Sequence, residues 1–268
     1  MNNSGLGKAV VAAMAMTVCG VAQAQPSPAL DRISFWIGGS NLDTEATLGA
    51  TNFDPPTQGK LDLGEGNQSI TRARLDLLLF DAQGFSFDYY SLNRSKNRSY
   101  DGEFMFHGTP FDLSANLATD FDIDLGSAAW RWWFGSGSDV FGLGLGAAYY
   151  RVSLDLRGTA QIEGEPTSAQ EYWSESAVAP VITLAYKHAF SDAVRFYLDA
   201  NGLKKNGGPL AGHIYDIRAG IEWFPWTNFG ISAEYGKSKV SVHREWSDYS
   251  ADFTSDFHGP SVFARVRF

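Results

Sequence analysis

Residues 261–268 read SVFARVRF, and apolar and charged side chains alternate along this stretch. Its apolar positions are Val262, Ala264, Val266 and Phe268. Successive side chains of a β-strand point to opposite faces of a sheet, so the stretch predicts a strand with one apolar face and one face that carries Arg265 and Arg267. A chain end is usually frayed and tolerant of change. A patterned end therefore indicates that these residues complete a sheet.

The same period of two recurs along the chain. It is clear in four further stretches: TRARLDLLLF (71–80), TDFDIDLGSA (119–128), AVRFYLDA (193–200) and YDIRAGIEW (215–223). After residue 24 there is no sustained apolar stripe with helical spacing. Soluble sandwiches and membrane barrels both show this alternation. The pattern therefore predicts an all-β fold and leaves its environment open.

Short and long connections alternate between the strand-like stretches. Tight turns are predicted at 81–84, 135–139, 190–193 and 225–228, and long polar connections at 48–68, 99–113, 157–171, 203–212 and 244–256. Short turns on one side and long loops on the other are typical of an antiparallel up-and-down transmembrane barrel. About ten strands are predicted, with eight as the alternative: 32–47, 69–80, 85–98, 114–134, 140–157, 172–189, 194–203, 213–224, 229–243 and 257–268.

Strand length and aromatic residues favour a membrane. The run from Phe141 to Tyr150 matches the roughly 9–11 residues that a tilted strand needs to cross a bilayer. Aromatic rings gather near the ends of predicted strands, as at Trp130, Trp132 and Trp223, and membrane barrels carry aromatic girdles at these positions. Closing the sheet would satisfy every strand edge, which a bilayer requires.

A closed sheet would place the charged face of the strands in the lumen. The predicted lumen-facing charges are Arg72, Arg74, Asp76, Asp88, Asp120, Asp122, Asp124, Arg195, Asp199, Asp216, Arg218, Glu222, Glu234, Arg265 and Arg267. Buried charges are costly unless they are paired, so one interpretation is a network of ion pairs that fills the barrel. The other is a polar conduit that selects solutes. Side chains nearly fill a barrel of about eight strands, which favours the network at ten.

The N-terminal residues predict export. Lys8 is followed by the apolar run AVVAAMAMTVCGVA and by AQA at 22–24, the pattern of a signal peptide that is cleaved after these residues. We therefore expect a signal peptide at 1–24 and one barrel domain at 25–268. The mature chain would lack cysteine and carry a net charge of 20 − 30 = −10. An acidic chain is not expected to bind nucleic acid.

The sequence contains no convincing motif for catalysis, a metal or a cofactor. GLGLGAA at 142–148 contains a GxGxxA pattern, but a strand-like stretch follows it where a dinucleotide site requires a helix. We interpret its glycines as small lumen-facing residues that make room for large neighbours such as Trp130 and Trp132. The five histidines have no ligand spacing. We expect no catalytic, cofactor-binding or metal-binding residues.

The C-terminal stretch resembles the closing strand of Gram-negative outer-membrane β-barrel proteins. These proteins end in a strand with alternating apolar residues and a terminal aromatic residue, and the matching positions here are Val262, Ala264, Val266 and Phe268. The resemblance implies an outer-membrane location and recognition of this stretch by the barrel assembly machinery. It also implies contact with outer-membrane lipid and lipopolysaccharide. It does not identify the member of the class.

We expect a non-enzymatic protein, either structural or a narrow pore for small polar solutes. The alternatives are a surface enzyme, of the omptin protease or the lipid-A-modifying type, and an adhesion or binding barrel. An omptin needs an Asp-Asp pair and an Asp-His pair, for which Asp122 with Asp124 and Asp256 with His258 are the candidates. The match is poor, because the first pair belongs to a longer acidic row within a predicted strand.

Overall fold

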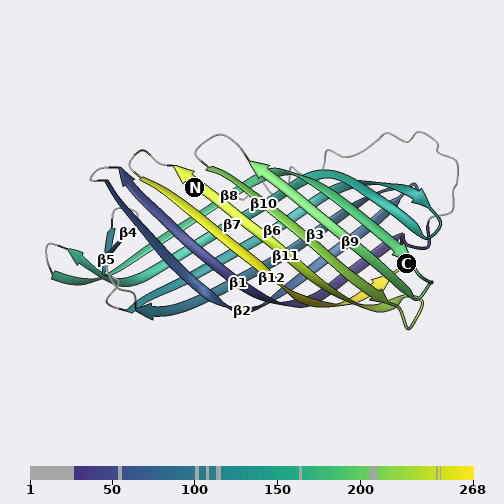
Figure 1. Cartoon of the computed structure of the whole chain (residues 1–268), viewed down its shortest axis with the longest axis horizontal. Helices are drawn as coiled ribbons and strands as arrows, with labels where there is room; N and C mark the ends of the chain where they lie inside the picture. Colours follow the sequence, from purple (N-terminus) through teal and green to yellow (C-terminus); the bar gives the residue numbers. More distant parts are fainter. Residues whose placement is uncertain are drawn as a thin grey trace, which may run out of the picture.

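The described part of the protein is all-β (Figure 1). The computed structural model describes residues 27–53, 56–99, 103–106, 109–112, 116–162, 165–205, 210–245, 247 and 249–268. The signal peptide predicted at 1–24 lies outside these residues. Within them, no helix is long and apolar enough to cross a membrane.

Ten long strands form the wall of a closed barrel. They are β1 (Ile33–Phe53), β2 (Pro56–Leu79), β3 (Gln83–Ser99), β6 (Asn116–Ser136), β7 (Asp139–Ile162), β8 (Glu165–Ala189), β9 (Val194–Lys205), β10 (Leu210–Trp223), β11 (Phe229–Glu245) and β12 (Tyr249–Arg267). Each strand pairs antiparallel with the next, and β12 pairs with β1. The prediction of an up-and-down barrel of ten strands is confirmed.

A small hairpin extends one connection of the barrel. It consists of β4 (Glu103–Phe106) and β5 (Thr109–Asp112), between β3 and β6. Strand β5 touches the barrel wall through Phe111, which pairs with Ala160 of β7. Figure 1 places the hairpin at the end of the barrel opposite the C-terminus.

Several strands are longer than predicted. Strand β1 continues to Phe53 and β7 continues to Ile162, so the connections predicted at 48–68 and 157–171 are wrong for much of their length. Strand β7 has 24 residues, whereas about 9–11 are enough to cross a bilayer. The barrel therefore extends well beyond the thickness of a membrane.

Among the described side chains, a band of large apolar residues covers the outer face of the half of the barrel that carries the turns after Leu79, Ser136, Ala189 and Trp223. Large apolar side chains are exposed there on neighbouring strands, including Ile33, Phe35, Ile37, Leu143, Leu145, Ile182, Leu184, Ile217, Ile221, Ile231 and Val262. We call this surface the lipid-facing band. Its inner side carries charged residues, such as the buried Arg74 and Glu222. This is the inside-out pattern of a membrane barrel.

In the other half of the barrel, charged side chains face outward and apolar side chains face inward. On β7, Arg151 and Arg157 are exposed on the outside, while Val152, Leu154 and Leu156 are each 2 % exposed or less on the inside. Every wall strand contributes to the interior cluster, which we call the outer core: Ala46, Leu48, Ile70, Leu92, Ile123, Leu125, Ala129, Ala148, Tyr150, Val152, Leu154, Leu156, Trp173, Ala179, Val181, Leu203, Ile214, Val240, Val242, Phe253 and Phe257. This half has the pattern of a water-soluble barrel. It therefore projects from the membrane at the end of the barrel opposite the turns that follow Leu79, Ser136, Ala189 and Trp223.

The first and last strands pair from Ser34 with Arg267 to Asn52 with Tyr249, with a break in the pairing at Asn41 and Leu42. Phe268 and Ile33 exchange two backbone hydrogen bonds, with N–O distances of 2.8 and 3.0 Å. Val262 and Phe268 are exposed on the outside, whereas Arg265 and Arg267 are buried inside. The predicted orientation of the closing strand is confirmed.

Deletion of Phe268 should impair assembly of the barrel. The deletion removes both hydrogen bonds to Ile33 and one aromatic side chain at the membrane edge, so we expect less folded protein in the membrane. The measurement is the amount of the folded, heat-modifiable form in outer-membrane fractions, with Phe268→Tyr as the control that keeps an aromatic ring. Wild-type levels of the deletion variant would contradict this role.

Candidate functional site

The interior of the membrane-embedded half is filled by three layers of ion pairs. The layer nearest the short turns is centred on Asp31, which directly precedes β1. The Asp31 carboxylate accepts hydrogen bonds from Arg195 at 2.8 and 2.9 Å and from Arg265 at 2.9 Å. Arg265 also forms an ion pair with Glu222, and both side chains are fully buried. These contacts join the segment that precedes β1 to β9, β10 and β12.

Aromatic rings separate the cations of this first layer. The guanidinium carbon of Arg265 lies 4.0 Å from the centre of the Trp36 ring, and that of Arg267 lies 3.7 Å from the Phe224 ring. Cation–π contacts of desolvated guanidinium groups are worth about 2 kcal/mol. These contacts stabilise buried arginines, so the first layer holds more arginines than carboxylates.

The second layer is centred on Asp199 of β9. Its carboxylate accepts hydrogen bonds from Arg74 at 2.7 Å and from Arg131 at 3.0 Å, so one acid joins β2, β6 and β9. Asp76 lies 3.0 Å from the Arg74 guanidinium. The buried Lys187 ammonium lies 5.5 Å from the centre of the Trp133 ring.

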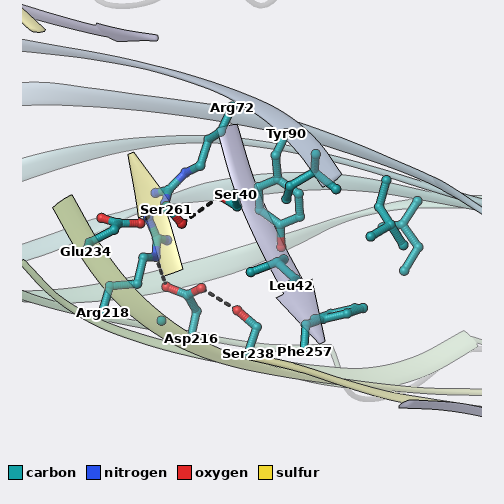
Figure 2. Close-up of a pocket in the computed structure, with 14 residues that line it drawn as sticks. Ser40, Leu42, Arg72, Tyr90, Asp216, Arg218, Glu234, Ser238, Phe257 and Ser261 are labelled. Carbon is teal, nitrogen blue, oxygen red and sulfur yellow. Dashed lines mark hydrogen bonds and ion pairs between the residues drawn. The ribbon is translucent and has the colours of Figure 1, made fainter. Parts of the chain in front are cut away.

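The third layer lies deeper in the barrel, and Figure 2 shows its members Arg72, Asp216, Arg218 and Glu234. Arg72 forms ion pairs with Asp88 and with Glu234, the latter at 2.8 Å. Arg218 lies 3.0 Å from Asp88 and also pairs with Asp216. We call the three layers together the ion-pair plug. Its groups come from both sides of the barrel, so the plug crosses the lumen.

A small cavity separates the plug from the outer core. Figure 2 shows Arg72, Glu234 and Asp216 on its polar side and Leu42 and Phe257 on its apolar side. Its volume is about 40 Å³. This is room for a few water molecules. Two further cavities along the lumen measure about 30 and 20 Å³. The linings of the two larger cavities share Tyr90, Asp216 and Arg218, so these cavities lie next to each other around the third layer of the plug.

The structure places most of the predicted lumen charges inside the barrel. The residues that face inward and join the plug are Arg72, Arg74, Asp76, Asp88, Arg195, Asp199, Asp216, Arg218, Glu222, Glu234, Arg265 and Arg267. Glu222 contacts Arg265 of the last strand, whereas Glu234 contacts Arg72 of β2. Arg267 instead donates to the backbone oxygens of residues 192 and 227.

The prediction for the acidic row of β6 is wrong. Asp120, Asp122 and Asp124 lie on the outside, while Ile123 and Leu125 between them are buried in the outer core. The rule that apolar residues face outward holds only where lipid surrounds the barrel. This part of β6 lies in the projecting half, where water surrounds it and the apolar side chains turn inward.

Sequence reasoning missed Arg131 and Asp31. Arg131 lies on the inward face of β6 together with Ile123 and is 5 % exposed. Because the acidic row was predicted to face inward, Arg131, on the opposite face of the strand, was predicted to face outward. The signal was present in the sequence, because Arg131 stands between Trp130 and Trp132 as a single charge in an aromatic run. Asp31 was overlooked because it precedes the first strand.

The glycines of β7 have the predicted role but a different neighbour. A Cβ atom at Gly142 would lie 2.9 Å from the ring of Trp133, and one at Gly144 would lie 2.8 Å from the side chain of Arg131. The neighbours are therefore Trp133 and Arg131 inside the barrel. Trp130 and Trp132, which we expected at this place, lie on the other face of β6.

The structure does not bring the candidate omptin residues together. Asp122 and Asp124 point outward from β6, and Asp256 and His258 lie on the outer face of β12. Three strands, β1, β2 and β3, separate β6 from β12 along the shorter path around the barrel. Among the described residues, no group of three or more potential ligands could hold a metal ion.

Asp199→Ala should strongly destabilise the barrel. The change leaves the buried guanidinium groups of Arg74 and Arg131 without their shared carboxylate, and breaking a buried pair in this way costs about 3–5 kcal/mol. Asp122→Ala is the matched control, because an exposed surface substitution changes stability by about 0.5 kcal/mol or less. The free energy of unfolding in urea measures both. Equal losses for the two variants would rule out the inward position of Asp199 and the outward position of Asp122.

Comparisons with known proteins agree with the fold. No protein-family model and no curated protein match the sequence. The outer membrane protease OmpT from Escherichia coli is similar in structure, with a TM-score of 0.56 and 10 % identity over 88 % of this chain and 96 % of that protein. The translocator domain of the autotransporter NalP from Neisseria meningitidis has a TM-score of 0.50 and 10 % identity, over 88 % of each chain.

These likenesses concern the fold alone, and the lipid-facing band gives the independent physical reason for a membrane. A closed antiparallel barrel with an apolar outer band and a charged interior satisfies every backbone group within lipid. The chain therefore has the fold of the Gram-negative outer-membrane β-barrels and is an integral protein of that membrane.

Proposed function

We propose that the protein is a non-enzymatic, non-conducting barrel that carries its outer connections clear of the membrane. The observation that carries this proposal is that the lumen is blocked twice. The ion-pair plug fills the membrane-embedded half, and the outer core fills the projecting half. The structural interpretation of the sequence is therefore favoured over the narrow pore.

The outer core is the stronger argument against a pore. An aqueous conduit needs polar walls along its whole length, because an ion in an apolar constriction loses its hydration. Here Leu154, Leu156 and Phe253 are each 3 % exposed or less. Their side chains occupy the space through which a polar solute would have to pass.

The geometry gives little support to a surface enzyme. His243 Nδ1 lies 2.7 Å from a carboxylate oxygen of Asp252, but both side chains are exposed on the outer wall. In the described part of the chain, no serine hydroxyl is hydrogen-bonded to this pair. A nucleophile activated by a base requires that contact. OmpT is a protease by its description, and the low identity transfers no activity to this chain.

A binding role for the projecting half is the second candidate. Strands β7 and β8 contain 24 and 25 residues, more than twice the length needed to cross the bilayer. The residues beyond the membrane form the projecting half of the barrel, which has its own apolar core. Surface loops positioned by a rigid scaffold are common binding sites, so the projecting half suits an adhesion or binding protein.

Purified protein in a planar lipid bilayer should show no conductance. An Arg74→Ala/Asp199→Ala variant should also fail to conduct, because the outer core still blocks the lumen after one layer of the plug is weakened. Single-channel recording of both proteins provides the measurement, and an established porin in the same bilayer is the positive control. Stable conductance steps from the wild type would refute a sealed barrel and restore the narrow pore.

A further inference from the structure

Lys187 of β8 is a buried cation without a counter-charge of its own. The residue is 4 % exposed, and its Nζ atom makes no hydrogen bond or ion pair with any residue that the structure describes. The ring of Trp133 is near, with its centre 5.5 Å from Nζ. A lysine ammonium has three N–H donors, and a buried charge is costly unless it is paired and hydrogen-bonded. The position therefore requires a ligand that none of the described residues supplies.

Lys187 lines a small cavity in the half of the barrel that carries the short turns. The charged residues of its lining are Lys187, Arg131, Arg265, Asp31 and Asp76. Its volume is about 20 Å³. One water molecule needs roughly 10–15 Å³ of such space. The cavity therefore has room for one small ion and is too small for a larger organic anion.

Both carboxylates that line the cavity already have partners. Asp31 accepts hydrogen bonds from Arg195 at 2.8 Å and from Arg265 at 2.9 Å. Asp76 accepts a hydrogen bond from Arg74 at 3.1 Å. These contacts take up the negative charge beside the cavity, so Lys187 shares the site mainly with other cations.

The first two layers of the ion-pair plug carry an excess of positive charge. Their described members are six cations and four carboxylates: Arg74, Arg131, Lys187, Arg195, Arg265 and Arg267 against Asp31, Asp76, Asp199 and Glu222. In the third layer, by contrast, carboxylates outnumber arginines. The positive excess is therefore concentrated around the cavity, where an anion would offset it.

Arg131 adds a second donor without a partner. Its Nη1 donates to Asp199 at 3.0 Å, whereas its Nε is buried and has no hydrogen-bond acceptor among the described residues. The guanidinium carbon lies 6.0 Å from the centre of the Trp133 ring, the same ring that lies beside Lys187. Two cations with unused donors thus lie near one ring and line one cavity.

The segment that precedes β1 forms part of the cavity wall. Leu30 and Asp31 line the cavity, and Leu30 packs in a buried cluster with Leu78 and Val140. These side chains shield the cavity from bulk water. The attraction between Lys187 and an anion in the cavity is therefore screened much less by salt than that of an exposed pair.

We propose that this cavity binds one small monovalent anion of about the size of chloride, with the Lys187 ammonium as a direct ligand. Arg131 and Arg265 supply further positive charge around the ion. The anion gives Lys187 the partner that the chain lacks and offsets part of the positive excess in the first two layers. The inference goes beyond the proposed function, and it holds whether or not the lumen conducts.

Unfolding by urea tests the site in solution. Protein folded in lipid vesicles is placed in sodium gluconate, whose anion is too large for the cavity, and gluconate is then replaced by chloride at constant ionic strength. A ligand that binds only the folded form stabilises it by mass action. We expect the urea midpoint of the wild type to rise with chloride, and to continue rising with each tenfold increase above the dissociation constant.

Two variants separate this site from a general effect of the salt. Lys187→Met removes the ammonium and keeps a long side chain, so its urea midpoint should be the same in chloride and in gluconate. Lys237→Met is the matched control, because Lys237 is exposed on β11 and does not line the cavity. This control should respond to chloride like the wild type. Equal midpoints of the wild type in both salts would overturn the proposal, and so would an unchanged chloride response in Lys187→Met.

Bromide provides a second measurement that does not depend on the folding of Lys187→Met. Crystals of the wild type are grown in sodium bromide, and anomalous scattering locates the bound bromide ions. We expect one buried bromide within hydrogen-bond distance of Lys187 Nζ. Water alone in this cavity would contradict the assignment. Bromide confined to exposed cations such as Lys237 would also contradict it, because the crystals would then hold an adventitious ion only.

Discussion

The medium that surrounds the barrel decides which face of each strand is apolar. Lipid surrounds the half with the short turns, so Leu143 and Leu145 of β7 point outward there. Water surrounds the other half, so Leu154 and Leu156 of the same strand point inward. The backbone and the period of two do not change along β7. Only the assignment of apolar and polar residues to the two faces is exchanged.

Two different interiors follow from this exchange. In the lipid-surrounded half the inward residues are polar, and closing a barrel around them buries charges that must be paired. Asp199 and Asp31 each accept hydrogen bonds from two arginines. The rings of Trp36 and Phe224 make cation–π contacts with Arg265 and Arg267. In the projecting half the interior is an ordinary apolar core. The plug specifies how the strands face one another, and the core supplies hydrophobic stability outside the membrane.

The sequence was sufficient to predict a barrel of about ten antiparallel strands and its seam, because the period of two is a local signal. The long connections that it predicted at 48–68 and 157–171 are mostly strand. It was not sufficient to locate the point on each strand where the medium changes. Asp122 and Ile123 alternate as regularly as Arg74 and Leu75, yet their faces are reversed relative to the lumen. Deciding between the two orientations requires the height of each residue above the membrane. That height follows from strand register around the closed barrel, as in the pairing of Asp122 with Asn93 and Ser153.

Folding explains why the projecting outer wall is polar, but it does not explain where its charges lie. Neutral residues are enough to face water, and β8 uses Ser174 and Ser176 on its outer face. Exposed acids lie on β1, β6 and β12, at Asp43, Asp122 and Asp252. On β12, Asp256 lies 3.7 Å from Lys239 of β11, so charges of both signs share this part of the wall.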